Sequence, residues 1–239
     1  MANLSWKLAW VVHGHADKSI LDSYDTERRP HARSVINFAL MMGRLVMPSN
    51  RLTALGVHGL MSLAQYIPPA RAFFEELKIK PSARFGRGLF KMGKTRSKLV
   101  RGGMLPQGLV RKGIGAPILP SDDALGTRLT LVGFGCDPTT RLNPSLLATW
   151  QQAGGAIVHL RHRGQAGTGV HSWEDMTDAL VPGAAPAGWV AVVRPDRTVM
   201  HDGPLEELGR IVSESLTLLR TGQPARAELY SAAAEWQGL

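Results

Sequence analysis

The single cysteine of this 239-residue chain, Cys136, is its best-suited side chain for redox chemistry. Thiol–disulfide exchange needs an attacking thiolate and a resolving thiol separated from it by two residues. Thr139 occupies the resolving position, which excludes a dithiol mechanism. One cysteine also excludes an intramolecular disulfide framework and a metal site built from clustered cysteines. We expect Cys136 to be a small packed residue, with a monothiol role as the alternative.

Histidine pairs are the next candidates for chemistry, because imidazole is a common metal ligand. His13 stands two residues from His15, and His159 three residues from His162. Neither pair has a nearby cluster of carboxylates or thiolates, and neither shows structural-zinc spacing. We therefore predict no metal site.

Basic residues concentrate between Lys78 and Lys112, where the sequence has eleven Lys and Arg and no Asp or Glu, within a chain of net charge +9. This segment is glycine-rich and lacks helical or strand periodicity, which predicts a long solvated loop or linker. Phosphate binding would be electrostatically reasonable, but no DNA- or RNA-binding motif accompanies the charge. Only Phe85 and Phe90 could stack on bases. We expect no nucleic-acid partner, and a loop that lies over an acidic neighbour or another domain.

The composition is that of an ordinary globular protein, with 44% hydrophobic and 20% charged residues. The longest apolar runs, at 38–42 and 189–193, are far below the ~20 residues of a membrane-spanning helix. Lys7 lies inside the first helical pattern and no small-residue cleavage site follows, which argues against a secretory signal. We expect a cytoplasmic protein with no membrane partner.

The N-terminal residues predict a helical hairpin. Leu4, Leu8, Val11 and Val12 share one side of a helix flanked by Trp6 and Trp10, which favours a core role for the tryptophans. Asp17 can cap a second helix with apolar Ile20, Leu21 and Tyr24. Pro30 either ends that helix or kinks one that continues through residues 32–47.

From residue 128 onward the pattern predicts one compact α/β unit. The expected elements are a strand at 129–134, a helix beginning at Asn143-Pro144, a strand at 156–160, a short helix at 171–180, a hairpin of 189–193 with 198–200, and a helix at 204–219. This order, with a parallel strand pair followed by an antiparallel pair, is that of a thioredoxin-like domain. Cys136 then follows the first strand, where the attacking thiol would stand, and Gly188 falls where active thioredoxins place a cis-proline.

Residues 3–30 resemble the helix pair that closes the FAD domain of single-component flavin-dependent aromatic hydroxylases. The motifs on which this resemblance rests are Asn3-Leu-Ser-Trp-Lys-Leu8 and Leu21-Asp-Ser-Tyr-Asp-Thr-Glu-Arg-Arg-Pro30. Residues 66–73, 78–81, 104–107 and 132–138 are similar to segments of the 3-(3-hydroxyphenyl)propionate hydroxylase group within that family. The resemblance runs along nearly the whole chain.

The resemblance implies an α/β fold in which a thioredoxin-like C-terminal domain follows a helical segment of an FAD-binding domain. The corresponding boundaries are 1–77 for the helical part, 78–125 for the basic glycine-rich linker, 126–222 for the thioredoxin-like domain and 223–239 for a C-terminal tail. Glu27, Arg28 and Arg29 are expected to form ion pairs that hold the hairpin against the FAD domain. Asn3 is a weak candidate for cofactor contact, and anchoring its helix is the favoured role.

For the intact family the resemblance implies aromatic compound catabolism, in which NAD(P)H reduces FAD and the oxygenated flavin hydroxylates a phenolic acid ortho to its hydroxyl. Met1-Ala2 stands where the family has an Asp-Ala dipeptide after a Gly-rich loop, and the Gly-x-Gly-x-x-Gly fingerprint is not in this sequence. We therefore expect the C-terminal part of such a monooxygenase, with no catalytic residue assigned, no tight FAD binding and no activity by itself. The alternative is a non-enzymatic thioredoxin-like module that serves oligomerisation, as in a homo-oligomer.

Overall fold

The computed structural model describes residues 2–47, 55–56, 59, 84–165, 167, 169 and 171–222. The chain forms two compact units, Met1–Glu27 with Arg84–Leu239 and Arg28–Ala83. The resembling segments at 66–73 and 78–81 and the expected tail at 223–239 lie outside the described residues.

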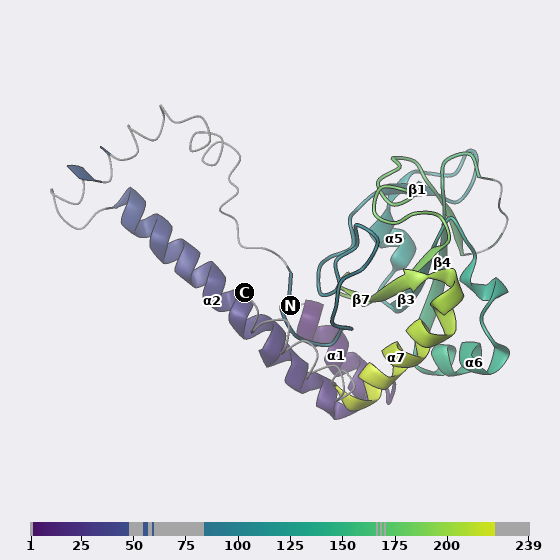
Figure 1. Cartoon of the computed structure of the whole chain (residues 1–239), viewed down its shortest axis with the longest axis horizontal. Helices are drawn as coiled ribbons and strands as arrows, with labels where there is room; N and C mark the ends of the chain where they lie inside the picture. The colour runs from purple at the N-terminus through teal and green to yellow at the C-terminus, as the bar shows by residue number, and fades with distance from the viewer. Residues whose placement is uncertain are drawn as a thin grey trace. The chain divides into compact units, whose positions relative to one another are not determined.

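A mixed β-sheet forms the centre of the first unit (Figure 1). In the described residues it has seven strands in the order β2-β1-β5-β4-β3-β6-β7. β3 and β4 are parallel, as are β4 and β5, and the remaining neighbours are antiparallel. The strands are β1 (Leu109–Arg111), β2 (Leu119–Pro120), β3 (Leu129–Phe134), β4 (Gly155–Arg161), β5 (Ser172–Asp175), β6 (Trp189–Val193) and β7 (Val199–Pro204).

The other described elements are helices and short 3-10 turns. The first helices are α1 (Ala2–Val12), η1 (Lys18–Leu21) and α2 (Asp22–Val46), and α5 (Ser121–Leu125) follows β2. The later elements are η2 (Pro138–Thr140), α6 (Pro144–Gln152), η3 (Leu205–Glu207) and α7 (Leu208–Thr221). α6 contacts β4, α7 contacts β6 and β7, and the two helices pack against each other.

The alternation of side chains along β3 divides the core into two layers. Leu129 and Leu131 belong to one apolar cluster, together with Trp150 of α6 and residues of α1 and α7. Val132 and Phe134 point to the other cluster, which contains buried residues of α5 and of the segments near 99–105 and 180–185. Helices therefore cover one face of the sheet, and mainly irregular segments cover the other.

Most of the elements expected after residue 128 are confirmed. β3, α6, β4 and the β6–β7 hairpin lie at or within a residue or two of their predicted bounds, although β7 extends to Pro204 and α7 begins after the short turn η3. Asn143 caps α6 by accepting a hydrogen bond from the Ser145 N–H at 3.0 Å.

The short helix predicted at residues 171–180 is wrong, because Ser172–Asp175 forms β5. The acidic residues that suggested a helix N-terminus have other partners. Glu174 pairs with Arg111 of β1 at 2.9 Å, across neighbouring strands. The Asp175 carboxylate accepts hydrogen bonds from the backbone N–H groups of Leu180 and Val181 at 2.7 and 3.0 Å and so organises the following turn.

The predicted buried face of α1 also needs correction. Leu8 is 44% exposed and Val12 is 80% exposed in the structure. Asn3, Trp6, Lys7 and Trp10 form the buried stripe instead. These positions have the i, i+3, i+4, i+7 spacing of one helical face, and the two indole rings supply its apolar area. The prediction that the tryptophans belong to the core is confirmed.

The second expected helix forms, and Pro30 lies inside it. Asp17 accepts a hydrogen bond from the Ser19 N–H at 2.8 Å and caps η1, which leads directly into α2. α2 continues from Asp22 to Val46, so the continuous alternative holds. Ile20 is fully buried, whereas Tyr24 remains 36% exposed.

The described part of the basic segment is not a solvated loop. Leu89, Phe90 and Leu99 are 0–2% exposed and belong to the two core clusters. The Lys91 and Gly102 N–H groups donate to the carbonyls of Met200 and Val199 on β7. Apolar residues between the cations pack this stretch against the sheet. Sequence periodicity does not show that these residues are buried, because the backbone here forms no helix or strand. The domain boundaries at 77/78, 125/126 and 222/223 stay a prediction.

Among the described residues, no helix combines the length and the apolar character needed to cross a membrane.

Candidate functional site

Five polar side chains from distant parts of the sequence meet in the interior of the first unit. We call Asn3, Lys7, Glu27, Arg194 and Asp196 the Glu27 cluster. Asn3 and Lys7 come from α1, Glu27 comes from α2, and the last two come from the turn between β6 and β7. Lys7 and Arg194 are fully buried and Glu27 is 1% exposed, so this cluster is screened from solvent.

The carboxylate of Glu27 is the centre of the cluster. Arg194 donates two hydrogen bonds to this carboxylate, from Nη1 to Oε1 at 2.6 Å and from Nη2 to Oε2 at 2.9 Å. Lys7 Nζ and Asn3 Nδ2 donate to Oε2 at 2.9 and 2.7 Å, and the Leu89 N–H donates to Oε1 at 2.8 Å. The bidentate arrangement is the strongest geometry available to an arginine and a carboxylate.

The other edge of the Arg194 guanidinium faces Asp196. Nε and Nη2 donate to the two carboxylate oxygens at 3.1 and 2.6 Å. Asn3 Nδ2 also donates to Asp196 Oδ2 at 2.7 Å, so one amide bridges both carboxylates. The guanidinium lies over the ring of Trp6 at 5.2 Å, which adds a cation–π contact. Two carboxylates and two cations are thus held together with nearly balanced charge.

The pKa values show which charges persist. Burial raises the pKa of Glu27, but the attraction of Arg194 and Lys7 and the donated hydrogen bonds outweigh burial and hold it below its ordinary value. Burial has the same effect on Asp196, and Arg194 again outweighs it, so its pKa falls to about 2. Burial lowers the pKa of Lys7 to about 8, and Glu27 offsets only part of this shift. At neutral pH both carboxylates and both cations are therefore charged.

The cluster is suited to anchoring and not to catalysis. Each carboxylate is occupied by donors, and the site is closed to solvent, so it offers neither an open base nor a nucleophile. Gly88 allows the close packing, since a Cβ built there would lie 2.2 Å from Cγ of Glu27. The expected ion pair between Glu27 and the FAD domain is wrong for this residue. Glu27 instead fixes the helix pair to the β6–β7 turn.

Family comparisons divide the chain into two matching parts. Residues 1–39 match the family of the FAD binding domain, and residues 102–218 match the HcaD C-terminal domain. Asn3, Lys7 and Glu27 fall in the first match, and Arg194 and Asp196 fall in the second. The Glu27 cluster therefore joins residues of the two matches, and all five of its members lie in the unit formed by residues 1–27 and 84–239.

Curated relatives agree with both matches. The chain is 32% identical over 245 residues to the 3-(3-hydroxy-phenyl)propionate/3-hydroxycinnamic acid hydroxylase of Klebsiella pneumoniae subsp. pneumoniae, covering 95% of this chain and 42% of the relative. A second enzyme of that name from Burkholderia vietnamiensis is 31% identical over 210 residues, covering 83% of this chain and 38% of the relative. The chain belongs with the FAD-dependent aromatic hydroxylases. It corresponds to their C-terminal portion and spans about two fifths of the length of these relatives.

Solved hydroxylase structures share the fold. The flavin-dependent monooxygenase PieE superposes with a TM-score of 0.63 at 17% identity, over 90% of this chain and 43% of PieE. The anhydrotetracycline hydroxylase OxyS from Streptomyces rimosus gives 0.60 at 23% identity, over 94% of this chain and 40% of OxyS. The mixed α/β architecture is therefore that of the C-terminal regions of FAD-dependent hydroxylases.

Asn3 is the one residue predicted to contact the cofactor. Both hydrogen bonds of its amide nitrogen go to Glu27 and Asp196. Its Oδ1 is buried without a hydrogen-bond partner among the described residues. An acceptor oxygen does not hold a phosphate, and no chemical step is assigned through the flavin. Cofactor contact by Asn3 stays a prediction.

Cys136 lies just after β3 and is half-buried. Its Sγ donates a long hydrogen bond to the Trp189 carbonyl at 3.4 Å. Burial raises the pKa of the thiol to about 11, although backbone hydrogen bonds act in the opposite direction. The thiol is thus protonated at neutral pH, which supports the packed residue over a poised monothiol.

The histidine pairs are not brought to any acidic cluster. His15 Nδ1 contacts the Gln152 carbonyl at 3.0 Å, beside an open cavity of about 380 Å³ between the ends of α1, α6 and α7. His159 is partly buried on β4, where burial lowers its pKa. Nowhere in the described residues do three His, Cys, Asp or Glu side chains gather so that they could hold a metal ion.

Sequence reasoning missed Arg194 and Asp196 as members of the central cluster. Both stand in the hairpin turn Arg194-Pro-Asp-Arg197, where charged residues ordinarily face solvent. The available signal was their position directly after a fully buried strand, β6. That signal is weak, because the two side chains are removed from water only by the packing of α1 over the turn.

Proposed function

We propose that this chain is the C-terminal part of an FAD-dependent, NAD(P)H-using monooxygenase that hydroxylates a phenolic acid, such as 3-(3-hydroxyphenyl)propionate, ortho to its hydroxyl group. The names of the curated relatives support this substrate class. The proposal includes a cytoplasmic location and the cofactor pair of FAD and NADH. Its alternative is a non-enzymatic module that serves oligomerisation.

The Glu27 cluster is the observation that carries the proposal. It joins Glu27 of the FAD-binding match to Arg194 of the C-terminal match through hydrogen bonds of 2.6 and 2.9 Å. A buried bidentate pair tolerates little displacement. We infer that the C-terminal domain acts by holding the last helices of the FAD domain in place, with Asn3 as an anchor of α1.

We also propose that the C-terminal domain is thioredoxin-like without redox chemistry of its own. The arrangement β4-β3-β6-β7, with β3 parallel to β4 and antiparallel to β6, agrees with that topology. Cys136 has Thr139 in place of a resolving thiol and a raised pKa. In this proposal the domain has a structural role.

A further part of the proposal is that the 239-residue polypeptide, tested by itself, neither retains FAD nor oxidises NADH. After incubation with FAD and desalting, it should carry no flavin absorbance. It should also leave NADH unconsumed when 3-(3-hydroxyphenyl)propionate is added. A stoichiometric yellow complex would contradict this part.

A chimera tests the function directly. This chain replaces the matching C-terminal portion of the Klebsiella hydroxylase, and bound FAD, substrate-dependent NADH oxidation and hydroxylated product are measured. We expect all three. The same chimera with Arg194→Met should lose FAD occupancy or activity, whereas one with the surface change Arg210→Met should keep both. A folded chimera that holds FAD but does not hydroxylate the phenolic acid would contradict the proposed substrate class.

A further inference from the structure

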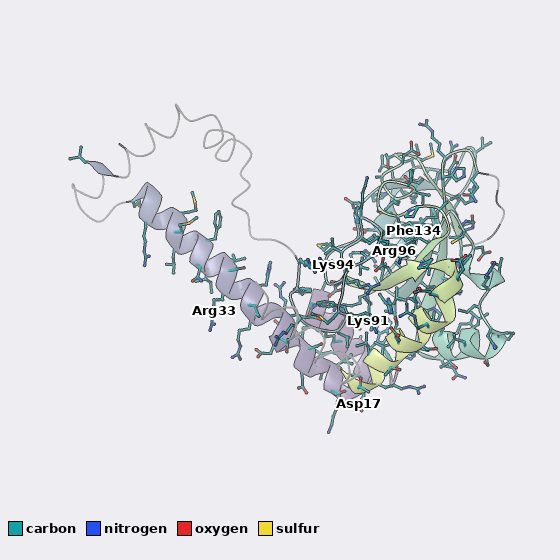
Figure 2. All side chains as sticks on the ribbon, in the orientation of Figure 1. Asp17, Arg33, Lys91, Lys94, Arg96 and Phe134 are labelled. Atoms are coloured by element: carbon teal, nitrogen blue, oxygen red, sulfur yellow. The ribbon has the colours of Figure 1, made fainter. Side chains whose placement is uncertain are left out.

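The stretch from Lys94 to Val100 has alternating exposure along its backbone. Lys94, Arg96, Lys98 and Val100 are exposed, and the intervening Thr95, Ser97 and Leu99 turn toward the protein. Figure 2 labels Lys91, Lys94 and Arg96 on this part of the first unit. We call Lys94, Arg96 and Lys98 the basic ridge. Four residues of extended chain span at most about 14 Å, so the three charges lie within that length of backbone.

Asp202 of β7 holds the inward side of this stretch. Its carboxylate accepts hydrogen bonds from Thr95 Oγ1 and from Ser97 Oγ, the latter at 3.1 Å. It also accepts from Arg101 Nε at 2.7 Å and from the indole of Trp189 at 2.8 Å. Asp202 is fully buried, so these hydrogen bonds are shielded from competition with water.

Backbone contacts and the core add to this anchoring. The Lys98 N–H donates to the Ala184 carbonyl at 3.1 Å, and Leu99 is 2% exposed within the apolar core. The backbone that carries the basic ridge is therefore held in one conformation although it belongs to no helix or strand. A binding surface ordered in advance loses less conformational entropy when a partner docks.

The cations of the ridge differ from the basic residues beside them. Lys91 pairs with Glu214 at 3.0 Å, and Arg101 pairs with Asp202. Within the described part of the chain, the side chains of Lys94, Arg96 and Lys98 make no hydrogen bond or ion pair. The neighbouring cations Lys91 and Arg101 are thus paired within the chain, whereas the three cations of the basic ridge face solvent and can contact a partner.

We propose that the basic ridge is a docking surface for an acidic segment of a partner protein. This role lies beyond the proposed hydroxylase function and does not depend on it. Complementary charge would steer the encounter and set its salt dependence. Val100, 40% exposed, supplies an apolar contact at the end of the ridge.

The structure disfavours single-stranded nucleic acid as the occupant. Base stacking requires exposed aromatic rings beside the cations. Phe85 and Phe90, the aromatic residues of the basic segment, are 9% and 2% exposed and belong to the core. The ridge also lines no part of the cavity beside His15, so a surface contact fits it better than an enclosed small molecule.

The test is a binding titration with the full chain and a fluorescein-labelled peptide of alternating Glu and Ala, followed by anisotropy at low salt. An oligothymidylate of equal charge is the competing probe. The ridge variant carries Lys94→Gln, Arg96→Gln and Lys98→Gln. A matched control removes the same charge from three exposed cations elsewhere, by Lys18→Gln, Arg141→Gln and Arg163→Gln.

We expect the wild-type chain to bind the acidic peptide more tightly than the oligothymidylate, and to release it as salt rises to about 0.15 M. Loss of three exposed ion pairs should weaken binding about tenfold in the ridge variant, against about twofold or less in the control. Both variants should keep the wild-type urea midpoint. Equal weakening in both variants, tighter binding of the oligothymidylate, or no peptide binding at low salt would each overturn the proposal.

Discussion

The Glu27 cluster and the ion pairs on the surface of α7 use the same residue types in opposite environments. Arg194 is fully buried and is held by Glu27 and Asp196. Arg210 of α7 is 50% exposed and contacts Glu207 and Glu214, the latter at 3.3 Å. Both arginines face two carboxylates. The surroundings, and not the number of partners, decide what each arrangement contributes.

In the interior the cost of removing charges from water is large, and only nearly complete pairing offsets it. Every member of the Glu27 cluster consequently depends on the others. At the surface, water solvates each group whether or not the pair forms, so the pair adds little. The cluster can therefore specify how α1 and Glu27 meet the β6–β7 turn, whereas the α7 pairs only adjust local stability.

The largest predicted effect is that of Arg194→Met. The change leaves the Glu27 and Asp196 carboxylates buried without their main counter-charge, and we expect a loss of about 3–5 kcal/mol in the free energy of unfolding. Urea unfolding followed by tryptophan fluorescence measures it. Arg210→Met is the control, and an equal loss in the two variants would remove the distinction between buried and surface pairs.

A smaller effect is expected for Lys7→Met, because Glu27 keeps both hydrogen bonds from Arg194. We predict a loss of about 1.5–3 kcal/mol at neutral pH, the range for a hydrogen bond to a charged group. The pKa of Lys7 is lowered from 10.5 to about 8 in the folded chain. Between these values the unfolded chain binds a proton that the folded chain lacks, so wild-type stability should rise with pH across this window.

Unfolding midpoints measured from neutral pH to pH 10.5 test this linkage. The rise should be absent in Lys7→Met. A wild-type curve parallel to that of the variant would mean that Glu27 keeps Lys7 charged and that burial does not dominate its pKa.

Cys136 shows burial acting without an opposite charge. The pKa of its thiol rises to about 11, whereas the pKa of Glu27 falls because Arg194 is present. Native Cys136 should therefore alkylate slowly at neutral pH, and unfolding in urea should accelerate the reaction. Cys136→Ser should cost about 1–2 kcal/mol, since a half-buried hydroxyl needs a partner. Fast alkylation of native Cys136 would instead support the alternative of a reactive monothiol.

The smallest effect is predicted for Arg210→Ala, which removes both surface pairs of α7. We expect a change within about 0.5 kcal/mol, decreasing further at high salt. Thermal unfolding at low and high ionic strength measures it. A loss comparable to that of Lys7→Met would show that the α7 pairs act as a network and not as isolated surface contacts.

Local sequence patterns were sufficient to predict an element where its own apolar periodicity or cap residues mark it. β3 and the β6–β7 hairpin were predicted because their apolar residues bury both faces of a strand, and α6 because Asn143 and Pro144 mark its start. The family motifs in residues 3–30 likewise need only the order of the residues. These features, together with the α/β class, follow from the sequence by itself.

Tertiary packing decided the features that depend on distant segments. The sequence could not show which face of α1 is buried, because Trp6 and Lys7 become interior only when the β6–β7 turn and Glu27 cover them. It could not show that Ser172–Asp175 is a strand, because its pairing with β4 and β1 is remote in sequence. Within the described part of the basic segment, Asp202 anchors Thr95 and Arg101, which lie more than a hundred residues away in sequence. Helix and strand propensity act locally along the chain, so the sequence by itself determined the elements that depend on them. Desolvation depends on everything that surrounds a side chain, so only the folded structure decided which charged and polar residues are buried.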